Sequence, residues 1–142
     1  HEGSLTTLHA NSPRDAIHRI ETMVLMNQIL IPVPAIREYI ESAIDIVVEI
    51  RRLSDGRRKV TNISEVVGFK EDEIFLQSIF AFRQNGINEN NDVNGEFVLY
   101  NYVPKVYDRI KQKGITDIDD IFENIEKNEK PKKTSKKKKE VK

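Results

Sequence analysis

The sequence predicts an α/β domain, because segments with helical and with strand-like hydrophobic spacing follow one another along its 142 residues. Apolar side chains recur at helical spacing within residues 16–26 and again within residues 36–44. Shorter β-branched runs then flank an Asp-Gly turn at residues 55–56. We expect a strand-helix start, a pair of helices, an antiparallel β-region and C-terminal helices.

The first expected elements are a short strand and a capped helix. Residues 4–10, SLTTLHA, have the β-branched and apolar composition of a strand. Ser12 is a good N-cap, Pro13 suits the first helical turn, and Asp15 lies near the positive end of the helix dipole. The helix should continue to about Met26.

A second helix and a β-region should follow. Pro32 and Pro34 prevent a continuous helix, so the second one is expected over residues 35–43. The Asp-Gly turn at residues 55–56 predicts a β-hairpin. Residues 73–82 alternate closely enough to form a third strand beside it.

The remaining segments are expected to be a loop, two helices and a tail. Residues 86–96 are rich in Asn, Gly and Asp, which predicts a surface loop that buries nothing. A helix should span residues 104–113 and stop at Gly114, and a short acidic helix should follow in residues 117–125. The Lys-dominated residues 127–142 have no apolar periodicity and should be disordered.

Charge is unevenly distributed, although the whole chain has a formal net charge of 0. Residues 130–142 contain eight lysines and one glutamate, a net charge of +7, so the preceding residues carry −7. Binding to a phosphate backbone needs clustered Lys and Arg, which argues against nucleic acid as a partner of the folded body. The absence of cysteine excludes disulfides, thiolate nucleophiles and cysteine-zinc sites. No apolar run approaches the roughly 20 residues that span a bilayer.

The stretch TTLHANS, residues 6–12, carries polar side chains at the expected strand-to-helix turn. In an open α/β sheet, ligands bind at the carboxyl ends of strands and anions bind at helix N-termini. Taken without further evidence, these residue types are more simply explained by capping and packing.

The opening of the chain resembles the histidine box of the type II and type IV secretion ATPase superfamily. The residues that carry this resemblance are His1, Gly3, Ser4, Thr7, Leu8, His9 and Ala10. The runs GSLTTLHANSPRDAIHRIETMVLM, PVPAIREYIESAIDIVV and RRLSDGRRKVTNISEVVG are similar to the CpaF-type, or TadA-type, branch, the motor ATPases of Tad and Flp pilus machines. The similarity extends over residues 2–114 at varying strength.

The resemblance implies a RecA-like P-loop domain that assembles as a homo-hexamer, uses ATP and Mg²⁺, and works in the cytoplasm against inner-membrane secretion platform proteins. Residues 1–126 would be the C-terminal part of this motor domain, cut from a longer protein just after its Walker B region. No G-x-x-x-x-G-K-[ST] motif occurs in the 142 residues. We therefore expect this chain alone to bind no cofactor tightly and to hydrolyse no ATP.

The resemblance also implies roles for individual residues. His9 and Thr7, with His1 as a further member of the box, would sense the terminal phosphate of the nucleotide in the parent protein. The alternative for His9 is a histidine satisfied within the end of the sheet. His18 is expected to be an exposed helix residue, and no metal site is predicted.

Several arginines are candidates for contacts between subunits, although solvated salt bridges and a solvated hairpin tip are the alternatives. These are Arg14, Arg19, Arg52, Arg57 and Arg58. A different class of function also fits: a stand-alone, non-catalytic interaction module with an acidic body and a basic tail. The tail would contact anionic lipid weakly, at about 1 kcal/mol per basic residue near the surface, or remain solvated.

Overall fold

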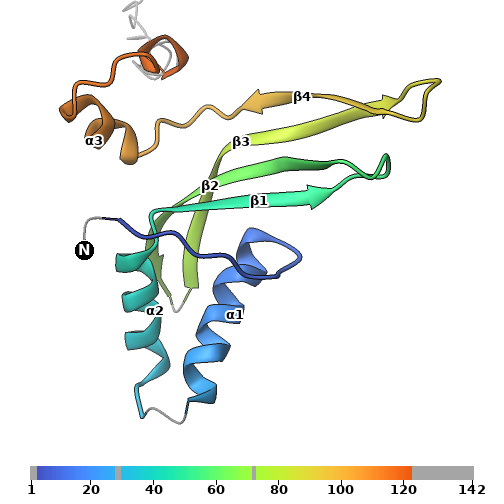
Figure 1. The fold of residues 1–142 in the computed structure, drawn as a ribbon. Helices are drawn as coiled ribbons and strands as arrows, with labels where there is room; N and C mark the ends of the chain where they lie inside the picture. Colours follow the sequence, from blue (N-terminus) through green and yellow to red (C-terminus); the bar gives the residue numbers. More distant parts are fainter. Residues whose placement is uncertain (1–2, 28–29, 72, 123–142) are drawn as a thin grey trace, which may run out of the picture.

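The computed structural model describes residues 3–27, 30–71 and 73–122. They form one four-stranded antiparallel sheet in the order β1-β2-β3-β4, with helices at both of its faces (Figure 1). The elements in chain order are α1 (Pro13–Met26), α2 (Val33–Ala43), β1 (Ile46–Arg52), β2 (Arg58–Lys70), β3 (Glu73–Ile87), β4 (Val93–Leu99) and α3 (Val106–Gln112). The mixed α/β class is confirmed. All strand pairs among the described residues are antiparallel, so the RecA-like architecture stays a prediction.

Helix α1 begins where its local signals predict. Ser12 has extended backbone angles, and its Oγ accepts a hydrogen bond from the Asp15 N–H at 3.1 Å. Pro13 occupies the first turn, where a missing N–H costs no helical hydrogen bond. The N-cap prediction is therefore confirmed.

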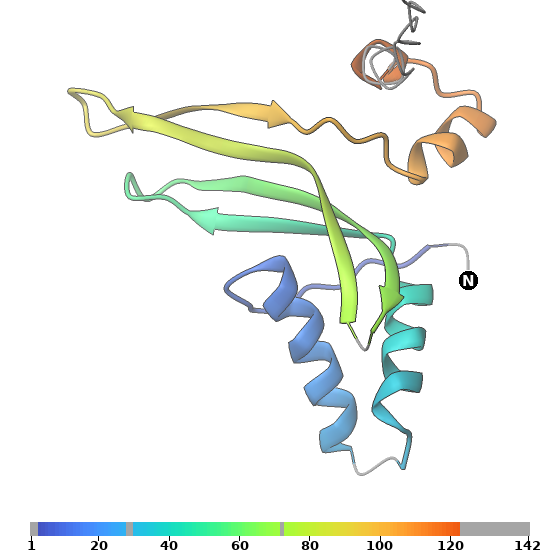
Figure 2. The same cartoon turned by 180° about the vertical axis from the view of Figure 1, so that it is seen from behind.

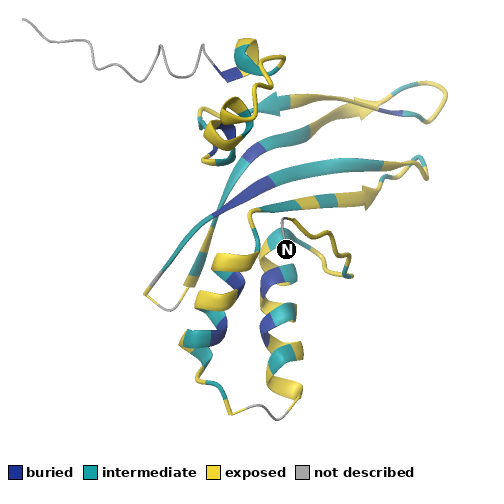
Figure 3. Ribbon diagram, turned by 60° about the vertical axis from the view of Figure 1, so that its left-hand side comes forward, coloured by how far each residue is buried: buried dark blue, intermediate teal, exposed yellow. Residues whose placement is uncertain are grey.

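Helix α2 begins at Val33, two residues before the predicted start, and ends at Ala43 as predicted. Pro34 lies in the first turn of the helix rather than before it. Ile36 and Ile40, four residues apart, bury one face of α2 against α1, and Figure 3 shows the buried parts of the two helices facing each other.

The predicted strand at residues 4–10 is wrong. Residues 3–10 have no regular secondary structure, and Figure 1 draws them as a coil leading into α1. A strand is defined by hydrogen bonds to a neighbouring strand, and no strand of the described sheet pairs with this segment. The segment therefore has a strand-like composition but no partner strand.

The predicted loop over residues 86–96 is also wrong in most of its length. Strand β3 continues to Ile87 and β4 begins at Val93, which is buried. The true turn covers residues 88–92, where Asn88 Oδ1 accepts hydrogen bonds from the N–H groups of Asn90 and Asp92. The Asn-rich composition marks this tight turn, not the two strand ends beside it.

The two faces of the sheet are covered by different helices (Figure 2). Helices α1 and α2 pack against β1 and β3 on one face, where the buried residues are Ile17, Ile36 and Ile40. A second core on the other face contains Ile79, Tyr107 and Phe122. Ile46 joins the second core and Val47 the first, because successive side chains of a strand point to opposite faces.

Helix α3 begins at Val106, two residues after the predicted start, and the chain turns at Gly114, where φ is +77°. Residues 119–122 are helical, in agreement with the predicted acidic helix, whose remaining residues lie outside the described part. The predicted tail, residues 127–142, and His1 lie outside it as well. None of the helices in the described ranges has the length and apolar character needed to cross a membrane.

Candidate functional site

The histidine-box segment, here residues 3–12, runs unpaired into the N-terminus of α1. Thr7 and His9 are both exposed, and neither hydrogen-bonds to any part of the chain that the structure describes. The alternative interpretation required His9 to be hydrogen-bonded within the end of the sheet. Within the described part of the chain, it is not. Leu8, between them, is half-buried. Thr7 and His9 are thus two exposed polar residues, two positions apart, on one unpaired segment.

The end of this segment is held to β1 by Arg51. Its Nη2 donates to the backbone carbonyl of Asn11 at 3.0 Å. The same guanidinium is fixed by Glu49, whose Oε1 accepts from Nε and Nη2 at 3.0 and 2.7 Å. Glu49 Oε2 accepts in turn from Thr61 Oγ1 of β2 at 2.8 Å. A hydrogen-bonded chain thus connects the interior of the sheet with the last residues before α1.

Arg14, predicted at a subunit contact, pairs within the chain. Its Nη2 lies 2.8 Å from Glu73 Oε1, which joins the start of α1 to the start of β3. Both side chains are largely exposed, so the pair contributes at most about 1 kcal/mol. Arg19 is exposed and forms no ion pair with any residue of the described ranges.

Helices α1 and α2 are joined by a more buried ion pair. Arg37 donates from Nη2 to Glu21 Oε1 at 2.8 Å and from Nε to Oε2 at 3.2 Å. The side chain of Glu21 is 9% exposed and that of Arg37 is 22% exposed. His18 lies beside this pair, with Nδ1 4.0 Å from Glu21 Oε2, and is exposed as predicted.

The tip of the β1–β2 hairpin contains the other three predicted arginines, and they differ in their contacts. Arg57 pairs with Asp55 at 2.8 Å and with Asp92 at 3.2 Å. Arg52 donates from Nε to the Gly56 carbonyl at 3.1 Å. The side chain of Arg58 is exposed and makes no hydrogen bond or ion pair with the residues that the structure describes.

Asp55 has the most perturbed carboxyl group of this tip. Hydrogen bonds from the N–H of Val93 and then of Arg57, together with the Arg57 guanidinium, lower the pKa of Asp55 to about 2, although burial opposes this. Asp55 in turn raises the pKa of Arg57. The carboxylate is therefore ionised at every physiological pH.

A buried carboxylate also accepts hydrogen bonds from the backbone at the start of α3. Glu65 accepts hydrogen bonds from the N–H groups of Lys105 and Val106, each at 3.0 Å, and from the hydroxyl of Tyr102. Burial, followed by the hydrogen bond to Glu65, raises the pKa of Tyr102. The contact of Glu65 with α3 could not be predicted, because nothing near Glu65 in the sequence indicates a helix about 40 residues later.

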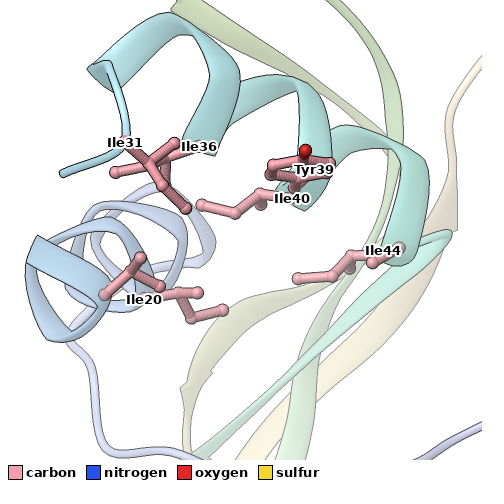
Figure 4. Close-up of a pocket in the computed structure, with 8 residues that line it drawn as sticks. Ile20, Ile31, Ile36, Tyr39, Ile40 and Ile44 are labelled. Atoms are coloured by element: carbon pink, nitrogen blue, oxygen red, sulfur yellow. The ribbon is translucent and has the colours of Figure 1, made fainter. Parts of the chain in front are cut away.

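An apolar groove of about 200 Å³ lies between α1 and α2, and Figure 4 shows its aliphatic walls. It is lined by Ile20, Val24, Ile31, Ile36, Tyr39, Ile40, Ala43 and Ile44. A second hollow, of about 250 Å³, is polar and lies between the end of α2 and the start of α3. Neither hollow includes a residue of the histidine-box segment. Within the described ranges, no three His, Asp or Glu side chains are grouped so that they could hold a metal ion.

Comparison with protein-family models gives no match to this chain, and comparison with curated proteins gives none either. The likeness to secretion ATPases therefore depends on the motifs in the sequence.

Proposed function

We propose that this chain is the C-terminal part of the motor domain of an ATPase that powers pilus assembly or protein secretion as a homo-hexamer. In this proposal the motor is RecA-like, uses ATP and Mg²⁺, and works in the cytoplasm against inner-membrane platform proteins. The observation that carries it is the exposed pair Thr7 and His9 on a segment whose end is fixed to both α1 and β1.

Thr7 and His9 suit a contact with a terminal phosphate. An imidazole N–H and a threonine hydroxyl both donate hydrogen bonds to phosphate oxygens, and hydrogen bonds to an anion are stronger than neutral ones. Bound Mg-ATP would supply the phosphoryl group that is transferred. Its phosphate cradle and its Mg²⁺ ligands belong, in this proposal, to a part of the parent protein outside the 142 residues.

The support of the segment suits a sensor. Ser12 caps α1, and Arg51 holds the carbonyl of Asn11, so residues 11 and 12 are tied to a helix and to a strand. A displacement of His9 upon loss of the terminal phosphate is therefore passed to α1 and β1 instead of being absorbed by a loose linker. Arg51 acts here as a positioning residue, because it touches the segment and not the nucleotide.

The test is the His9→Ala variant of the full-length parent protein. We expect ATP turnover to fall roughly ten- to a hundredfold, which corresponds to the loss of about 1.5 to 3 kcal/mol from a charge-assisted contact in the transition state. Affinity for ATP should change less than turnover. His18→Ala, on the exposed side of α1, is the matched control and should leave turnover unchanged.

A second variant keeps the result interpretable when His9→Ala fails to assemble. His9→Gln retains a hydrogen-bond donor and should restore part of the turnover. Normal turnover in both variants would refute the sensing role. The alternative function, a non-catalytic interaction module, predicts that the full-length protein binds no nucleotide at all.

A further inference from the structure

Two arginines at the tip of the β1–β2 hairpin face each other across the strands. Arg52 of β1 and Arg58 of β2 are register partners, and both are exposed. Directly opposite residues have Cβ atoms about 4.5 to 5.5 Å apart, and like charges in that position are destabilising. The isolated hairpin therefore contains an unfavourable pair.

The other cations of the tip are already engaged. Arg51 pairs with Glu49. Arg57 pairs with Asp55 and with Asp92, as described above. Lys59 places its Nζ 4.1 Å from the centroid of the Phe82 ring.

Arg52 and Arg58 differ from these three cations. Among the described residues no carboxylate pairs with either, and Arg52 reaches only the neutral carbonyl of Gly56. Two positive charges thus remain uncompensated at one exposed tip. Such a tip suits an anionic partner.

The opposite end of the same sheet is acidic. Figure 1 shows the hairpin tip at one end and α3 at the other. Asp108 of α3, and Asp117 and Asp120 after it, are exposed and form no ion pair within the described part of the chain. Asp119 accepts a hydrogen bond from the Tyr107 hydroxyl at 2.8 Å, which holds residues 117–120 against α3.

Cations are present at this acidic end too, and three of them contact other groups. Arg109 pairs with Asp45 at 2.9 Å, and Lys111 places its Nζ 4.4 Å from the centroid of the Tyr107 ring. Lys105 donates to the carbonyl of Val67 at 2.8 Å. Lys113, which is exposed, is outnumbered by the carboxylates of Asp108, Asp117 and Asp120.

We propose that Arg52 and Arg58 bind the carboxylates of Asp117 and Asp120 of a second copy of this chain. The two surfaces lie at opposite ends of one molecule, so the contact is head-to-tail, and repeated head-to-tail contacts form a ring when their rotation closes. Closure into a ring of six rests on the proposed function, whereas the contact itself rests on the charges alone.

The test is charge reversal in the full-length protein, with assembly measured by sedimentation velocity. Each of the double variants Arg52→Glu/Arg58→Glu and Asp117→Arg/Asp120→Arg should raise the dissociation constant of the assembly at least tenfold. An equimolar mixture of the two variants should assemble through pairs of opposite charge. Glu38→Arg, which reverses an exposed charge on α2 outside both surfaces, is the matched control and should assemble normally.

A neutral variant separates binding from folding. Arg52→Gln/Arg58→Gln removes the repulsion within the hairpin, so the thermal midpoint of the dissociated protein should stay the same or rise while assembly weakens. Normal assembly of the charge-reversed variants would overturn the proposal. So would a loss of assembly that the mixture does not reverse.

Mg-ATP binding, measured on the same samples, separates this contact from the proposed function. Rescue by mixing in a protein that binds no Mg-ATP would support the contact and refute the motor. Unchanged assembly in a protein that binds Mg-ATP would refute the contact alone. Weaker Mg-ATP binding with assembly intact would mean that the arginine pair binds phosphate, which overturns the proposal.

Discussion

Asp55, in the turn between β1 and β2, accepts a hydrogen bond from the backbone N–H of Val93, the first residue of β4, at 2.9 Å. The backbone ladder between β2 and β3 ends at Asn62 and Ala81. Beyond that point the two hairpins are joined by side chains instead. Lys59 over the Phe82 ring is a second such link.

Replacing Asp55 by Asn should loosen the two hairpin tips from each other. The amide oxygen can still accept one hydrogen bond, but the ion pair with Arg57 is lost. We expect faster hydrogen exchange at the Val93 amide, with the middle of β2 and β3 unaffected, and NMR exchange rates measure both. Equal exchange at Val93 in both proteins would show that Asp55 does not hold the tips.

The stability of the tip should depend on pH through Asp55. Its pKa is lowered in the folded state from 3.8 to about 2. The stabilisation is therefore complete above about pH 4 and is lost as the pH falls towards 2. The free energy of unfolding of the wild-type chain and of Asp55→Asn, measured between pH 5 and 2, should converge as the pH falls. A difference that stays constant over this range would contradict the assignment.

The ion pair between α1 and α2 should contribute more to the free energy of unfolding than the ion pair between α1 and β3. Arg37→Ala leaves the buried Glu21 carboxylate without its guanidinium partner, which should lower the free energy of unfolding by about 3 kcal/mol. Arg14→Ala breaks an exposed pair and should cost less than about 1 kcal/mol. Urea denaturation of both variants makes the comparison. Equal losses of unfolding free energy in the two variants would show that burial does not set the contribution of these ion pairs.

Gly95 of β4 should tolerate no side chain. A Cβ there would lie 2.4 Å from the carbonyl oxygen of Arg83 and 2.4 Å from the Phe82 ring. Gly95→Ala should therefore lower the free energy of unfolding by about 1 to 3 kcal/mol. Gly86→Ala, in β3 of the same hairpin, meets no atom within 4 Å and should be close to neutral. Thermal unfolding of the two variants tests this prediction. Equal midpoint temperatures would show that a side chain at residue 95 causes no clash.

Elements with local signals could be predicted from the sequence. Ser12 and Pro13 define the start of α1 through contacts within one turn, and the Asp-Gly turn defines the β1–β2 hairpin. Strand β4 was missed because its pairing with β3 is invisible in the Asn-rich composition around it. The opposite error occurs at residues 4–10, where a strand was predicted and none forms, since a strand-like composition supplies no partner strand.

The supports of the candidate site are also long-range. Arg51 reaches Asn11 across 40 positions of sequence, and Glu65 reaches Val106 across 41. Nothing in the sequence around either residue indicates such a contact. Thr7 and His9 are proposed because they match a motif, and a motif indicates chemistry without indicating what holds the residues in place.

The most direct test of the central claim is whether His9 responds to the terminal phosphate. Diethylpyrocarbonate modifies accessible histidines, and peptide mass spectrometry of the full-length protein measures His9 and His18 separately. With Mg²⁺ and a non-hydrolysable ATP analogue, His9 should be modified several-fold more slowly than with Mg-ADP, while His18 reacts equally in both. The same rate at His9 with either nucleotide, in a protein that binds both, would contradict the account.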